Sequence, residues 1–230
     1  MVGSKEQLSM LLLPTYLDQN GSKVKDSDFV EYLGLTFDKD FSWNRQVNAV
    51  VKKLNYKATI LRDISKYCPV SLRLTYYKAF IQPTLDYGIS VWGCTSNENL
   101  AKVQRVQNRI ARIITGNFDF INSRGLDLLH ELKLPNVIQR RNYFLSKLTF
   151  QSIHNLNPNY PNDNIVMVIE RHGHRTRRQD DVYLPTVRHE LYRNSLQHKG
   201  GYTFNLLPSS LKQCSEIDTF KRGYFRYLFN

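Results

Sequence analysis

Cysteine is scarce in this 230-residue sequence, and long apolar runs are missing. The three cysteines, Cys68, Cys94 and Cys214, are far apart and odd in number, which argues against a disulfide framework and favours a reducing compartment. The longest early apolar run, residues 10–13, is too short for a signal peptide or a membrane span. We therefore expect an intracellular protein, nuclear or cytoplasmic.

Signatures of several enzyme classes are also missing. The sequence has no Ser/His/Asp arrangement, no Gly-rich phosphate loop and no heptad run long enough for a coiled coil. Asp38 and Asp40 lack the third carboxylate expected of a polymerase Mg²⁺ site, so we interpret them as a polar turn after a strand. His172 and His174 have no C-x-x-C partner for zinc. We expect neither a catalytic residue nor a metal site in this chain.

Acidic residues are few relative to basic ones, and the formal net charge is +12. Residues 1–40 carry a net charge of −3, residues 41–115 carry +9 and residues 116–230 carry +6. A positive balance of this size favours a polyanionic partner, nucleic acid or an acidic membrane surface. Its concentration in the middle segment indicates where such a partner would bind.

The first 115 residues predict a small β element followed by three helices. Residues 7–13 and 29–37 have strand composition, with Asn20-Gly21 as a turn signal between them. Ser42 is a suitable N-cap for a helix to about residue 66. A nearly all-apolar helix over 71–92 should be buried, with a kink or break at Pro83. Ser96 and Gly116 would cap the third helix.

The second half predicts shorter helices and irregular segments. A short helix is expected near residues 126–132, and Pro135 should start a longer one to about residue 154. Residues 155–164 have loop composition, and an amphipathic helix is expected near 219–228. The predicted fold class is therefore mainly α with a small N-terminal β-hairpin, comprising a helical bundle and a helical or irregular C-terminal region.

Basic side chains recur at helical spacing. Three lie opposite the apolar face of the 42–66 helix: Arg45, Lys52 and Lys66. Four more are spaced 3, 4 and 3 apart on the third helix: Lys102, Arg105, Arg109 and Arg112. Arg175, Arg177 and Arg178 belong to a basic run near residue 175. Spacing alone leaves two interpretations open, a solvated charged face and contact with nucleic-acid phosphates.

Aromatic residues are abundant in the same part of the chain. Since they recur at helical spacing, we expect five of them to lie in the core and not to stack on bases: Trp43, Tyr76, Tyr77, Phe80 and Trp92.

Four stretches carry a resemblance to a known family. They are FVEYLGLTFD with FSW (29–43), YKAFIQPTLDYG with VW (77–92), the helix over 100–116, and PTVR, FNLLP and FKR (185–222). In this order, they resemble the region downstream of the palm in reverse transcriptases of non-LTR, Jockey-like retrotransposons. Phe204 and Leu206 depart from that pattern, where Trp and Ser are common.

The resemblance implies a division of the chain. Residues 1–41 would be the end of the palm with a primer-grip-like hairpin at Tyr32, Leu33 and Gly34. Residues 42–117 would be a thumb-like helical domain, and residues 118–230 the C-terminal region that follows it. The Mg²⁺-binding aspartates of such a polymerase belong upstream, so we expect no cofactor in this chain.

The resemblance also implies the partners. These are an RNA–DNA or DNA duplex, contacted through its phosphates, and the upstream palm and fingers of the parent polymerase, with no membrane. Under this hypothesis the chain is a fragment without the catalytic palm that binds primer–template without sequence preference. Two alternatives stay open: a stand-alone DNA-binding module and an inactive remnant of the element.

Overall fold

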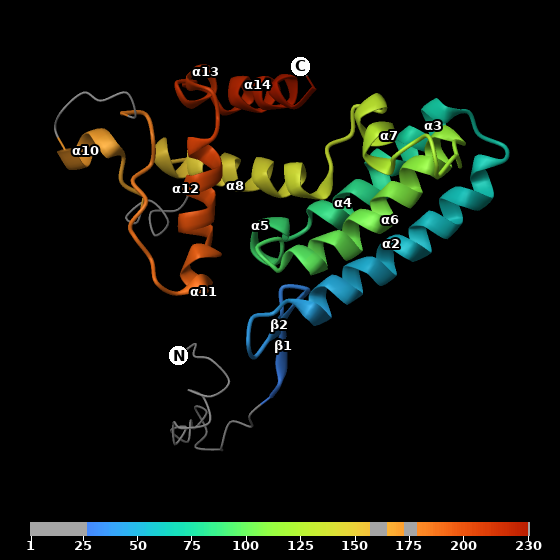
Figure 1. Ribbon diagram of the computed structural model, residues 1–230, viewed down its shortest axis with the longest axis horizontal. Helices are drawn as coiled ribbons and strands as arrows, with labels where there is room; N and C mark the ends of the chain where they lie inside the picture. The colour runs from blue at the N-terminus through green and yellow to red at the C-terminus, as the bar shows by residue number, and fades with distance from the viewer. Residues whose placement is uncertain (1–26, 157–164, 173–178, 230) are drawn as a thin grey trace.

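The structure is a computed structural model that describes residues 27–156, 165–172 and 179–229. It is mainly helical with one antiparallel hairpin near the N-terminus (Figure 1), which confirms the predicted fold class. The predicted strand 7–13 and the Asn20-Gly21 turn lie outside the described residues, as do Arg175, Arg177 and Arg178.

The hairpin forms within the stretch that was predicted to be a single strand. Strand β1 (Phe29–Tyr32) pairs with β2 (Leu35–Asp38), with Phe29 opposite Asp38 and Tyr32 opposite Leu35. Leu33 and Gly34 form the two-residue turn, with φ of +48° and +72°. Two consecutive positive φ values are what a tight hairpin turn of this length requires, so the prediction of one strand over 29–37 was wrong.

Helix α2 (Asn44–Ser65) begins one residue later than a Ser42 cap predicts, and Ser42 is not its N-cap. Trp43 occupies that position with a φ of +63° and makes no side-chain capping bond. The carboxylate of Asp38 substitutes for a cap, since it accepts hydrogen bonds from the Ser42 hydroxyl (2.9 Å) and the Arg45 amide (3.4 Å). The helix buries the predicted apolar stripe: Val47, Val50, Leu54, Ala58 and Leu61.

The predicted 71–92 helix is broken into four pieces. They are α3 (Val70–Tyr76), a π-helical turn η1 (Tyr77–Ile81), α4 (Gln82–Asp86) and α5 (Ile89–Trp92). Pro83 lacks an N–H and its ring would clash with the carbonyl four residues earlier, so a wide turn before it relieves the conflict. The expected all-round burial was wrong, because Leu72 and Phe80 are more than half exposed.

Helix α6 (Asn97–Thr115) has the predicted ends. The Ser96 hydroxyl accepts a hydrogen bond from the Asn99 amide (3.3 Å), and Gly116 terminates the helix with a φ of +75°. Two contacts show that helices α2 and α6 run parallel: Asn44 contacts Asn99 near the start of both helices, and Asn55 contacts Arg109 further along both.

These helices lie side by side as a helical bundle (Figure 1) and share one apolar core. Helices α3, η1 and α4 return antiparallel to α2, and Tyr77, Ile81 and Leu85 point inward from them. Trp43 and Trp92 are buried as predicted, whereas Phe80 is exposed and Tyr76 only partly buried. The core continues through α7 (Gly125–Glu131), where a short helix was predicted, to Val137.

Helix α8 (Val137–Ile153) connects this bundle to a second core. It starts with a reciprocal capping box between Asn136 and Gln139, so the predicted start at Pro135 was early by two residues. Helices α12 (Leu196–Asn205), α13 (Ser209–Lys212) and α14 (Ile217–Phe229) pack with the far part of α8 around Phe150, Phe204 and Phe220. Two short helices, α10 (Val168–His172) and α11 (Glu190–Arg193), lie along the connecting segments.

Candidate nucleic-acid interface

Most of the predicted basic residues gather on one face made by α2 and α6. Arg109 donates a hydrogen bond to the side chain of Asn55 (2.6 Å) and so links the two helices at this surface. Lys52 is one turn before Asn55 and Lys66 three turns after it, which places them on the same outer side of α2. We name this surface the α2/α6 basic face, with six members: Arg45, Lys52, Lys66, Lys102, Arg105 and Arg109.

Few carboxylates neutralise the α2/α6 basic face. Lys102 is held by Glu98 (3.5 Å), and Arg45 lies 3.7 Å from Asp38 with its guanidinium over the Phe29 ring. Within the described part of the chain, the other members of the face form no ion pair. The face therefore presents an excess of positive charge that an anionic partner can neutralise.

Arg112 does not belong to this face, although its spacing put it in the same stripe. Its side chain is 7 % exposed, and its guanidinium donates to the carbonyls of Asn117, Asp119 (2.9 Å) and Ser123 (2.6 Å). It also lies over the Phe120 ring, 4.3 Å from the centroid. Since these loop carbonyls already engage its donors, Arg112 organises the loop after α6 instead of facing solvent.

The tip of the hairpin is exposed and anchored from behind. Tyr32 and Leu33 are 65 % and 72 % exposed, and the Tyr87 hydroxyl donates a hydrogen bond to the Leu33 carbonyl. Gly88 allows the close approach, because a Cβ there would lie 2.7 Å from Leu35. An exposed leucine in the left-handed region is an uncommon and strained arrangement, typical of positions that serve binding.

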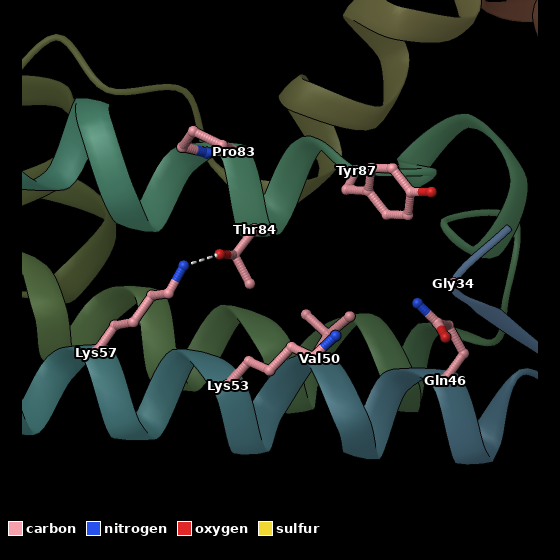
Figure 2. A pocket seen from close by; sticks show the side chains of 8 residues that line it. All are labelled: Gly34, Gln46, Val50, Lys53, Lys57, Pro83, Thr84 and Tyr87. Atoms are coloured by element: carbon pink, nitrogen blue, oxygen red, sulfur yellow. Dashed lines mark hydrogen bonds between the residues drawn. The ribbon is translucent and has the colours of Figure 1, made fainter.

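A groove beside the tip was missed by the sequence prediction. It has a volume of about 340 Å³ and lies between α2 and α4, with Gly34 at one end (Figure 2). Lys53 and Lys57 line it from α2, with Lys57 reaching across to Thr84, while Thr84 and Tyr87 border it on the other side. Helical spacing places Lys53 and Lys57 one turn apart and off the predicted basic stripe, but it predicts no cavity. Only the position of α4 reveals the cavity.

The described residues form neither a metal-binding cluster nor a membrane-spanning helix. Across residues 27–156, 165–172 and 179–229, no group of three His, Cys, Asp or Glu side chains is placed to hold a metal ion. The helices in those ranges are all too short or too polar to cross a bilayer. Arg171, the described arginine of the basic run, lies over the Tyr183 ring at 3.8 Å from its centroid.

Sequence comparisons identify the class of protein to which this chain is related. Its homologues are RNA-directed DNA polymerases of non-LTR retrotransposons from Drosophila, which confirms the resemblance drawn from the sequence motifs. One relative is the probable RNA-directed DNA polymerase from transposon X-element of Drosophila melanogaster, 29 % identical over 138 residues. Others are the polymerase from mobile element jockey (25 % over 125 residues) and the probable polymerase from transposon BS (29 % over 110 residues), both of that species.

These matches cover part of each chain. They include 58 %, 51 % and 46 % of this chain, but only 15 %, 13 % and 12 % of the X-element, jockey and BS polymerases. No family model matches the chain. No solved structure matches it either.

Proposed function

We propose that this chain supplies a thumb-like nucleic-acid-binding part of a retrotransposon reverse transcriptase. In this proposal the α2/α6 basic face contacts the phosphate backbone of the primer–template duplex, and the hairpin tip at Tyr32, Leu33 and Gly34 positions the primer end. The observation that carries the proposal is the gathering of six basic side chains on two parallel helices. The kinship with retrotransposon polymerases supports it.

The geometry of the face suits a backbone contact without sequence preference. Fourteen residues separate Lys52 from Lys66, a rise of about 21 Å along α2, which parallels several successive phosphates of a duplex. Lysine and arginine neutralise phosphates through charge and do not read base edges from that position. A reverse transcriptase must slide along any template, so this mode of binding matches the need.

We also propose that the catalytic Mg²⁺ ions are held by a palm formed by other residues than those described. Asp38, at the end of β2, is engaged by the Ser42 hydroxyl and the start of α2. In the parent polymerase the hairpin would adjoin the palm and fingers.

The division at residues 41 and 117 also stays a prediction. The apolar core of the bundle extends beyond residue 117 to Val137, so a division by cores would fall near the start of α8.

The test is filter binding of the purified chain to an RNA–DNA hybrid across a salt series. If about five phosphates are engaged, the slope of log affinity against log salt should be near −4. A triple variant, Lys52→Gln with Arg105→Gln and Arg109→Gln, should make that slope shallower by about 3.

A matched variant controls for net charge. Arg188→Gln, Arg222→Gln and Arg226→Gln together remove the same charge from exposed positions outside the face, so the slope should stay near that of the unmodified chain. Absence of binding at low salt would contradict the proposal. Binding that depends strongly on duplex sequence would instead favour a stand-alone DNA-binding module.

A further inference from the structure

An exposed aromatic cluster lies next to the groove between α2 and α4. The rings of Tyr76 and Phe80 are 5.0 Å apart, and Phe80 is 54 % exposed. Tyr56, on α2, is 70 % exposed. The pKa of Tyr76 is raised, mainly by its own partial burial and further by the nearby phenol of Tyr56, so the two rings are neighbours. Large rings left in solvent at one place, in a chain with two formed cores, indicate a surface that is covered by a partner.

The cluster and the groove form one continuous strip. Lys57 joins them, since its ammonium donates to the Phe80 carbonyl (2.7 Å) and to the Thr84 hydroxyl (2.5 Å) on the groove wall. Tyr87, 56 % exposed, lies at the opposite end of the groove (Figure 2). From Gln46 to Lys57 the α2 wall rises about 17 Å, which is long enough for a few nucleotides.

The charge of the strip distinguishes between partners. The groove is lined by two lysines and by no carboxylate. Lysine is depleted from the centres of protein–protein interfaces, whereas lysines interleaved with exposed aromatic rings are typical of surfaces that bind single-stranded nucleic acid. The rings stack on bases and the ammonium groups follow the phosphates.

We propose that this strip, defined by Lys53, Lys57, Tyr56, Phe80 and Tyr87, binds single-stranded nucleic acid by stacking unpaired bases on Phe80 and Tyr56. Lys53 and Lys57 neutralise the phosphates between the stacked bases. The strip is separate from the α2/α6 basic face, because Lys53 and Lys57 lie on the side of α2 toward α4, while Asn55 contacts α6. One helix would then separate a duplex on one side from a single strand on the other.

The experiment compares two labelled strands of twelve nucleotides by fluorescence anisotropy. One strand is oligothymidylate, and the other has the same backbone with abasic sugars. The unmodified chain should bind oligothymidylate at least about tenfold more tightly, because stacking one or two bases has an effect of this order. Equal affinity for the two strands would overturn the proposal, since phosphate contacts alone would explain the binding.

Variants then locate the effect. Phe80→Leu keeps an apolar side chain but removes the ring, so affinity for oligothymidylate should fall about tenfold with no change for the abasic strand. Phe80→Trp should retain the base preference, and Tyr202→Ala removes a ring of similar exposure from α12 as a control. Lys53→Gln should weaken binding of both strands and lower the salt dependence.

Two further outcomes are decisive. If Phe80→Leu binds oligothymidylate like the unmodified chain, while thermal melting shows both to be folded, the strip is not a stacking site and the proposal fails. Hybrid duplex binding is measured on the same variants. It should be unaffected by Phe80→Leu, so failure of the strip proposal is distinguishable from failure of the duplex proposal.

Discussion

Arg112 illustrates how burial changes the role of a charged residue. Its guanidinium is hydrogen-bonded to three loop carbonyls and packed on Phe120, so removing it deletes all three charge-assisted hydrogen bonds that hold the loop on α6. We expect Arg112→Met to lower the free energy of unfolding by about 2–4 kcal/mol. Arg105→Met, about two α6 turns earlier and exposed, should change it by less than about 0.5 kcal/mol. Urea denaturation of both variants checks this, and equal stabilities would contradict the structural role of Arg112.

Tyr77 makes stability depend on alkaline pH. It is buried, and burial raises its pKa to about 12 even though Gln107 donates a hydrogen bond to its hydroxyl. Between pH 10 and 12 the unfolded chain loses this proton while the folded chain retains it, so stability is full below pH 10 and falls as pH rises. The two-unit difference corresponds to about 3 kcal/mol.

The measurement is the free energy of unfolding of Tyr77→Phe and of the unmodified chain over this range. Tyr77→Phe should lose less stability between pH 10 and 12, because its ring has no proton to release. Tyr202→Phe, at an exposed position, should follow the unmodified chain. Parallel pH curves for Tyr77→Phe and the unmodified chain would show that the buried phenol is not the cause.

At the scale of the elements, helix α8 begins with a reciprocal capping box. The Asn136 side chain accepts from the Gln139 amide (2.9 Å), and the Gln139 side chain accepts from the Asn136 amide (2.8 Å). Asn136→Ala removes one of these bonds and should destabilise the protein by about 1 kcal/mol. Asn136→Asp keeps the acceptor and should lie within about 0.5 kcal/mol of the unmodified chain in thermal unfolding. A loss of the same size in both variants would rule out the cap as the cause.

The elements also show what the sequence could and could not predict. Helices with one apolar stripe and end signals, such as α6 with Ser96 and Gly116, were predicted with their bounds. Local composition missed the hairpin within residues 29–37, because Leu33 is a poor residue for a positive φ and the Asn20-Gly21 signal favoured a turn elsewhere. The family resemblance, by contrast, implied a hairpin at Tyr32, Leu33 and Gly34, where the turn lies. Ser42 is a residue type that often caps helices, but the Asp38 carboxylate accepts the hydrogen bond from the Arg45 amide at the start of α2. This contact could not be predicted without knowing that the hairpin brings Asp38 next to the helix.

The candidate site was likewise predicted only in part from the sequence. Helical spacing predicted that the members of the α2/α6 basic face lie toward solvent, and all of them but Lys102 are exposed, since periodicity reports which side of a helix is solvated. It failed for Arg112, whose burial comes from the loop over 117–123 folding back on α6. It also gave no indication of the groove, because a cavity between α2 and α4 depends on how two helices pack.

At the scale of the whole molecule, α8 belongs to both apolar cores. Val137 lies in the core of the bundle, Phe150 lies in the C-terminal core, and Phe144 packs against both. Phe150→Ala should lower the free energy of unfolding by about 3–5 kcal/mol. Hydrogen exchange should show the loss mainly in amides of α12 and α14, with α2 and α6 retaining protection. Uniform loss across all helices would indicate one cooperative unit and no division of the chain by cores.

The π-helical turn at Tyr77–Ile81 has a consequence for how this surface could change. One extra residue in a turn shifts the angular phase of everything after it by about 100°. Relative to α3, the side chains of Thr84 and Tyr87 are therefore rotated onto the wall that faces Lys57 and the hairpin. A deletion of one residue from Tyr77–Ile81 would rotate Thr84 and Tyr87 away from Lys57 and the hairpin without changing which residues are present. The number of residues in this turn should therefore tolerate change less than the identity of its side chains.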